Sequence, residues 1–168
     1  MKILIVSFSR GGTAEAVAQA IHTQLSASAR LIVARIEPKR LRGYWGWLLR
    51  SFVPRSRVPI HPTVTNLTTY ELICLGFPKW TYACPPVNQY LLEMENCKGK
   101  DFALFMCHRG FDQERYLESM VKQVSQRGGR VVATLAAQQK TVEDGSYGES
   151  LMRFCDRIQS HLKEEKFQ

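Results

Sequence analysis

The first groups able to do chemistry are the hydroxyl, guanidinium and backbone amide groups of residues 7–13. They follow a short apolar run, residues 3–6, that is typical of a strand buried on both faces. Apolar residues spaced three and four apart over residues 14–25 then predict a helix. The first amides of that helix lack intrahelical partners, and the helix dipole favours an anion beside them. Gly11 and Gly12 would let the backbone approach a phosphate closely.

This turn has two interpretations. It is either a phosphate site or the tight turn that any α/β domain needs after its first strand. The turn lacks the lysine of an ATP-binding loop and the spaced glycine triplet of a dinucleotide fingerprint. Both of those nucleotide motifs are therefore poor matches.

A second candidate site follows a later apolar run at residues 70–76. The loop 77–84 holds Trp80 and Tyr82 among prolines. Either ring could stack on a flat aromatic ligand, which would contribute about 1 kcal/mol beyond the buried area. The same rings could instead cover the core or meet a neighbouring subunit, so the loop alone leaves both interpretations open.

The elements that must position these loops alternate along the chain. Apolar runs predict five strands, at residues 3–6, 30–36, 70–76, 101–107 and 130–137. Helical patterns lie between and after them, at 14–25, 85–94, 113–127 and 147–162, and Asp112 is the expected N-cap of the third helix. Such alternation predicts a parallel sheet with helices on both faces. Ligands bind beyond the carboxyl ends of such strands, which would bring together loops 7–13, 77–84 and 107–111.

The composition indicates an ordinary globular protein. A chain of 168 residues with 45% hydrophobic residues is long enough for one domain with a proper core. No apolar run is long enough for a membrane span or a signal-peptide core, so we expect a cytoplasmic protein. The cysteines show no metal-ligand spacing and are expected to be reduced thiols, with no metal site: Cys74, Cys84, Cys97, Cys107 and Cys155.

The formal net charge of +8 is concentrated in one segment. Residues 39–62 form a basic aromatic insertion that contains no acidic residue, whereas the charges elsewhere nearly cancel. Its basic residues are Lys39, Arg40, Arg42, Arg50, Arg55 and Arg57. The charge therefore belongs to this insertion and not to the fold.

Two stretches carry a resemblance to a known family. Residues 8–18 resemble, without a gap, the pattern Tyr-Ser-Arg-Thr-Gly-Asn-Thr-Glu-Lys-Val-Ala of the flavodoxin-like proteins, which bind flavin mononucleotide (FMN). Residues 75–80 and the later Pro85-Pro86 resemble the family's Leu-Gly-Ser-Pro-Val-Trp and Pro-Pro. The resemblance covers nearly the whole chain and implies one flavodoxin-like domain over residues 1–168, built as a three-layer α/β sandwich.

The resemblance also implies roles for individual residues. The phosphate of FMN would lie on Ser9, Arg10, Gly11, Gly12 and Thr13. The isoalloxazine ring would lie against Pro78, Lys79, Trp80, Thr81 and Tyr82, with His108, Arg109 and Gly110 on its other side. Gly11 and Ala14 replace two threonines of the family pattern. Each missing hydrogen bond to a charged acceptor would cost about 1.5–3 kcal/mol, which predicts weaker phosphate binding.

These residues favour a redox function that depends on FMN, because the flavin does the chemistry and the chain offers no separate acid–base dyad. Electron-carrying flavodoxins are typically acidic around the flavin. Here Lys79, Arg109 and Arg10 would surround it with positive charge, which favours a reduced anion and hydride chemistry. We therefore predict an NAD(P)H-linked oxidoreductase acting on quinones or similar acceptors. The alternatives are an electron carrier with a redox partner protein, and a non-enzymatic binding protein whose flavin site has decayed.

The basic segment 39–57 admits three interpretations. It could be a helix or loop that packs its tryptophans on the core and leaves its arginines in solvent. It could instead contact a membrane surface, which would suit a lipid-soluble quinone. A nucleic-acid site is the weakest interpretation because the segment is short and no binding motif accompanies it, so we expect no nucleic-acid partner. A homodimer also stays open.

Overall fold

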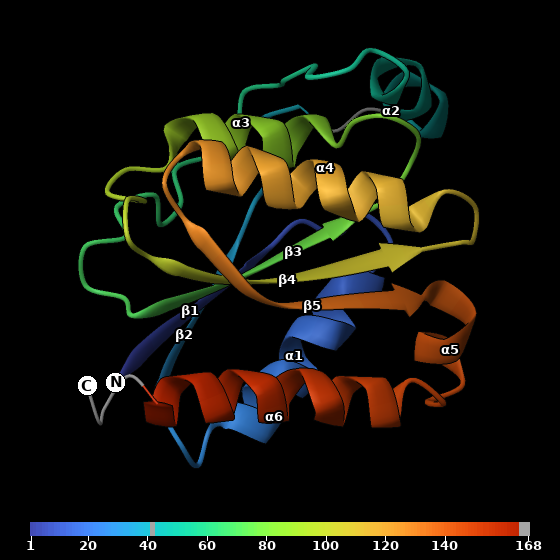
Figure 1. Ribbon diagram of the computed structural model, residues 1–168. Helices are drawn as coiled ribbons and strands as arrows, with labels where there is room; N and C mark the ends of the chain where they lie inside the picture. The colour runs from blue at the N-terminus through green and yellow to red at the C-terminus, as the bar shows by residue number, and fades with distance from the viewer. Residues whose placement is uncertain (41–42, 165–168) are drawn as a thin grey trace.

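Five parallel strands form the centre of the protein, in the order β2-β1-β3-β4-β5. The computed structural model describes residues 1–40 and 43–164. The strands are β1 Lys2–Ser7, β2 Arg30–Arg35, β3 Leu72–Pro78, β4 Asp101–His108 and β5 Arg130–Gln138. The helices are α1 Thr13–Leu25, α2 Tyr44–Ser51, α3 Pro85–Glu93, α4 Gln113–Gln126, α5 Gln139–Glu143 and α6 Gly148–Glu164. Figure 1 shows the sheet between two layers of helices, which confirms the predicted three-layer α/β sandwich.

Each face of the sheet has its own apolar core. On one face, α1 and α6 pack against the sheet through side chains such as Val17, Ile21 and Phe154. On the other face, α3 and α4 pack against it through side chains such as Tyr90 and Met120. The residues of β1, β3 and β4 are nearly all buried, as expected of central strands covered on both sides. All five cysteines lie in these cores without a disulfide bond.

The chain reverses its direction of travel across the sheet between β1 and β3. At the carboxyl end of β1, Ser7 pairs with Arg35 of β2 on one side and with Gly76 of β3 on the other. The chain goes first to β2 and then crosses to β3, and ligands bind at such a reversal in open α/β sheets. Gly76 is required there because a Cβ at this position would lie 2.1 Å from the Phe105 ring.

Part of the basic aromatic insertion forms the helix α2, in line with a helical interpretation of that segment, while Arg42 lies outside the described residues. Two features differ from the sequence-based expectations. The short helix α5 follows β5 directly and was not predicted. Asp112 does precede α4, but it has a φ of 49° and makes no side-chain cap hydrogen bond. Asp112 therefore occupies the predicted N-cap position but does not cap the helix with its side chain, because its left-handed backbone lacks the extended geometry that a side-chain cap needs.

Candidate functional site

The turn between β1 and α1 forms one end of a cavity. Gly12 occupies the N-cap position of α1 with a φ of 85°, a left-handed conformation that favours glycine. Because Gly12 has no side chain to cap the helix, the first-turn amides stay available to a ligand. A Cβ on Gly11 would meet no atom within 4 Å, so the turn is open on its outer side. The turn therefore has the backbone form of an anion site.

Trp80, just beyond β3, forms an aromatic wall of the same cavity. Its ring lies 5.8 Å from that of Phe8 in an edge-to-face arrangement, and 5.6 Å from that of Trp47. The backbone N–H of the preceding Lys79 donates to the carbonyl of Cys107 at 2.7 Å, which ties this loop to the end of β4. Aromatic contacts of this kind hold a ring in one orientation, so Trp80 can present a face to a planar ligand.

Helix α2 supplies the support behind Trp80. Trp47 is only 2% exposed and packs against both Phe8 and Trp80. Two hydrogen bonds join α2 to the loop: the Thr81 hydroxyl donates to that of Ser51 at 2.7 Å, and the Tyr82 N–H donates to the Ser51 carbonyl at 2.9 Å. The insertion is therefore part of the site wall, a role that the sequence analysis did not assign to it.

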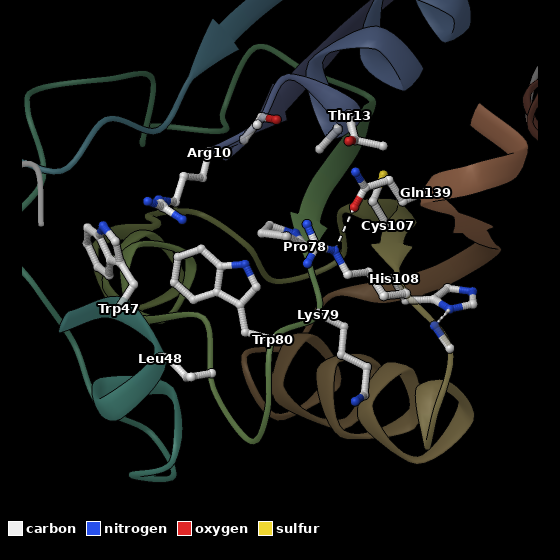
Figure 2. Close-up of a pocket in the computed structure, with 15 residues that line it drawn as sticks. Arg10, Thr13, Trp47, Leu48, Pro78, Lys79, Trp80, Cys107, His108 and Gln139 are labelled. Atoms are coloured by element: carbon white, nitrogen blue, oxygen red, sulfur yellow. Dashed lines mark hydrogen bonds between the residues drawn. The ribbon is translucent and has the colours of Figure 1, made fainter. Parts of the chain in front are cut away.

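The loop after β4 forms the side of the cavity opposite Trp80. The N–H of Gly110 donates to Nδ1 of His108 at 3.0 Å, so a neutral His108 carries its proton on Nε2. Nε of Arg109 donates to the side-chain oxygen of Gln139 at 2.8 Å, and Gln139 in turn donates to Glu143. Figure 2 shows Trp47 and Trp80 on one side of the cavity, and His108 and Gln139 on the other.

The cavity between these loops has a volume of about 320 Å³. Ten of the predicted site residues line the cavity: Ser9, Arg10, Gly11, Thr13, Pro78, Lys79, Trp80, His108, Arg109 and Gly110. Three predicted residues do not: Gly12 shapes the turn, Thr81 bonds to α2, and Tyr82 points to solvent against Phe52. The sequence analysis missed Ala14, Trp47, Leu48, Cys107 and Gln139 as lining residues. For Trp47 and Leu48, helical spacing within the insertion was the signal that could have found them.

The cavity is cationic. Arg10, Lys79 and Arg109 line it, and none of the described residues that line it carries a carboxylate. Burial, with a smaller contribution from the nearby charge of Lys79, lowers the pKa of His108 below its usual 6.5, so its ring is neutral at pH 7. Burial raises the pKa of the Cys107 thiol to about 12, so this sulfur is not a nucleophile at neutral pH. The site can therefore bind and orient an anion but holds no activated nucleophile of its own among these groups.

Known proteins resemble this chain in sequence and in fold. An uncharacterized protein of Archaeoglobus fulgidus is 38% identical over 112 residues, which is 66% of this chain and 68% of that protein. A flavoprotein of Lactobacillus acidophilus, solved in complex with FMN, matches 86% of this chain and 98% of its own with a TM-score of 0.63 and 19% identity. The apo form of an NADH:FMN oxidoreductase matches 95% of this chain and 89% of its own with a TM-score of 0.64 and 14% identity.

The two solved structures share the fold at low sequence identity. The family model described as Flavodoxin matches residues 2–141, which contain the anion-type turn, the Trp80 loop and the third loop. That match covers most of the chain and all three loops around the cavity. The chain belongs to the flavodoxin family.

Proposed function

We propose that this protein binds FMN and acts as an NAD(P)H-linked oxidoreductase on quinones or similar small acceptors. One observation carries the proposal: a single cavity joins a helix N-terminus open to an anion to an aromatic wall, with cations and no lining carboxylate among the described residues. The cavity volume of about 320 Å³ lies within the range of small-molecule sites. The flavoprotein solved with FMN and the NADH:FMN oxidoreductase, which share this fold, agree with this choice of ligand.

The residues fit the two ends of FMN. The first-turn amides of α1 and the hydroxyls of Ser9 and Thr13 would hold the phosphate, helped by the charge of Arg10. Trp80 would lie against the ring system, backed by Trp47. These assignments use groups that lie around one cavity.

The redox chemistry is that of the flavin, which when bound can take up two electrons as a hydride and pass them to an acceptor. The chain supplies position and electrostatics. Lys79 and Arg109 line the cavity and add positive charge to it, which would favour a reduced anion, and the neutral His108 carries a donor at Nε2. The apolar wall of Trp47, Leu48 and Trp80 excludes water from one side of the site, which strengthens those interactions.

The test begins with the visible absorption spectrum of the purified protein, with FMN added if it is colourless. We expect a flavin band near stoichiometry and consumption of NADH or NADPH when a water-soluble quinone is supplied. Lys79→Gln should slow this turnover, whereas Lys98→Gln, at an exposed lysine outside the cavity, should not. A colourless protein that does not quench FMN fluorescence would contradict FMN binding.

Membership of the flavodoxin family supports a second candidate, an electron carrier. A redox titration distinguishes the two. The oxidoreductase should be reduced in a single two-electron step, because the surrounding cations favour the fully reduced anion. Two one-electron steps separated widely in potential, with no turnover of NADH or NADPH, would favour the carrier.

A further inference from the structure

Helix α2 has a second face that the cavity does not use. Trp47, Leu48 and Ser51 point inward, whereas Trp45 and Leu49 are 73% and 69% exposed. Phe52, Val53 and Tyr82 are also more than half exposed, and the Phe52 and Tyr82 rings lie 6.2 Å apart. We call Trp45, Leu49, Phe52, Val53 and Tyr82 the apolar patch. Half of the large apolar side chains that are exposed in the described part of the chain lie in it.

The patch is held firmly in place. Trp47 anchors α2 in the aromatic cluster with Phe8 and Trp80, and Ser51 bonds to both Thr81 and Tyr82. Ser56 donates to the Arg50 carbonyl at 2.7 Å, which fixes the turn after the helix. The exposure of the patch is therefore a feature of the packed structure. Contiguous apolar surfaces of this kind mark interaction sites, unlike single exposed apolar side chains.

Only positive charge surrounds the patch within its own segment. Between Glu37 and Glu71 the chain has no acidic residue, and Arg40, Arg55 and Arg57 are exposed there. Aromatic and aliphatic side chains beside arginines match the interface of an anionic bilayer, where rings enter the headgroup region and cations meet lipid phosphates. We propose that the apolar patch docks this protein on the surface of an anionic membrane.

The alternatives fit this surface less well. In a symmetric dimer the same patch would meet itself, which would bring the arginines of two chains together with no acid from the segment to offset them. A single-stranded nucleic acid would satisfy the arginines but would gain nothing from Leu49 and Val53, which cannot stack on bases. No helix in residues 1–40 or 43–164 combines the length and apolar character needed to cross a bilayer, so contact would be peripheral.

Docking would also orient the cavity. The inner face of α2 contributes Trp47 and Leu48 to the cavity wall, so the patch and the cavity are two sides of one helix. Figure 1 shows α2 at the outside of the molecule, near the carboxyl ends of the strands. If the cavity holds a flavin, which rests on the proposed function, docking would place it beside the bilayer. A quinone with a hydrophobic tail is then the acceptor class that fits.

The direct test is sedimentation of the whole protein with lipid vesicles. We expect binding to phosphatidylcholine vesicles that contain phosphatidylglycerol, little binding to phosphatidylcholine alone, and loss of binding as salt is added. The double variant Trp45→Ser and Leu49→Ser should bind about tenfold less or worse. The matched control, Leu92→Ser with Met152→Ser, changes two exposed apolar residues elsewhere and should bind like the wild type.

Three results would overturn docking: background sedimentation with anionic vesicles, an equal loss in the control variant, or a dimer that only the patch variant dissociates. Retention on single-stranded RNA in place of vesicles would also overturn it, in favour of a nucleic acid. Vesicle binding needs no flavin, so it can succeed or fail independently of the proposed function. If the wild type both binds vesicles and turns over quinones, the patch variant should lose turnover with a vesicle-embedded quinone but keep turnover with a water-soluble one.

Discussion

Charged side chains are arranged differently at the two ends of the sheet. At the amino end, Asp101 of β4 is 2% exposed and accepts hydrogen bonds from Arg130 at 2.6 and 2.9 Å. Nε2 of His161 lies 2.6 Å from Oδ2 of the same carboxylate. At the carboxyl end, Arg10, Lys79 and Arg109 line a cavity that has no carboxylate among its described lining residues. At the amino end a carboxylate lies between two basic side chains, whereas no carboxylate accompanies the cations among the described residues that line the cavity at the carboxyl end.

This difference separates stability from binding. The buried Asp101 carboxylate, with Arg130 and His161 as partners, links β4, β5 and α6. Removing one member of such a buried ion pair lowers the free energy of unfolding. The cations give the cavity a positive potential that favours an anion, and a ligand that binds only the folded state should stabilise the folded protein. The comparison therefore predicts that changes at the amino end alter unfolding, whereas changes at the carboxyl end alter ligand affinity and potential.

The largest effect is expected from Asp101→Asn. Removal of the charge weakens the bonds to Arg130 and His161 and should lower the free energy of unfolding by about 2–3 kcal/mol. FMN affinity should stay unchanged because the site lies at the other end of β4. Urea unfolding measures the first effect and fluorescence quenching of FMN the second. Asp156→Asn, at an exposed position of α6, is the control and should change stability by about 0.5 kcal/mol or less.

The Asp101 carboxylate also predicts that the free energy of unfolding depends on pH. Burial alone raises the pKa of Asp101, but the hydrogen bonds and charges of Arg130 and His161 outweigh it, and the pKa lies below its usual 3.8. The ionised form therefore stabilises the fold in full well above pH 3.8, and this contribution is lost as the pH falls below it. The gap in stability between wild type and Asp101→Asn should shrink in acid, and a gap constant from about pH 6 to about pH 3 would contradict this assignment.

At the other end of the sheet, Trp80→Ala should weaken FMN binding roughly tenfold, because it removes both stacking and apolar area from the cavity. Circular dichroism must show an intact fold, since Trp80 also contacts Phe8 and Trp47. Trp45→Ala, on the outer face of the same helix that supports Trp80, is the control. Equal affinities of all three proteins would show that the ring does not lie against Trp80.

A gain of affinity is expected from Gly11→Thr. The position has room for a side chain, since a Cβ there meets no atom within 4 Å, and the change restores a hydroxyl of the family pattern. One added hydrogen bond to a charged acceptor, at about 1.5 kcal/mol, should tighten FMN binding about tenfold in the same titration. Gly148→Thr, at the start of α6, is a matched glycine that should have no effect on affinity. Weaker binding by Gly11→Thr would contradict the position assigned to the phosphate.

The smallest effect is expected from Lys79→Gln on the potential of bound FMN. Loss of one partly exposed cation should lower the two-electron midpoint by about 20 mV, the equivalent of about 1 kcal/mol. Potentiometry under anaerobic conditions measures it, with Lys98→Gln as the control. A midpoint that rises would mean that Lys79 does not act on the flavin through its charge.

The central strands and most helices could be predicted from sequence because their patterns depend on burial alone. The continuous apolar runs of β1, β3 and β4 and the three-and-four spacing of α1 and α6 are direct consequences of a sheet covered on both faces. The meeting of the three loops also followed from topology, since parallel strands end at one edge. Helix ends were less accurate: Asp112 has the usual residue type for a cap but a left-handed backbone.

The missed residues depend on contacts between segments far apart in the chain. Trp45 and Trp47 are two residues apart with identical side chains, yet one is 73% exposed and the other is buried against Phe8 and Trp80. The hydrogen bonds between Ser51 and the loop at Thr81 and Tyr82, together with the packing of Trp47, fix which face of α2 points inward. Gln139 enters the site because α5 begins directly after β5, with no turn signal in the sequence to indicate it.

The central claim is that one cavity holds an anion at the α1 turn and a flat ring at Trp80. Calorimetric titration with FMN and with riboflavin, which lacks the phosphate, tests it most directly. If the phosphate partners at the turn together contribute as much as two charge-assisted hydrogen bonds, FMN should bind about a hundredfold more tightly than riboflavin. Trp80→Ala should weaken both ligands alike. Equal affinities for FMN and riboflavin, or no binding of either, would contradict the account.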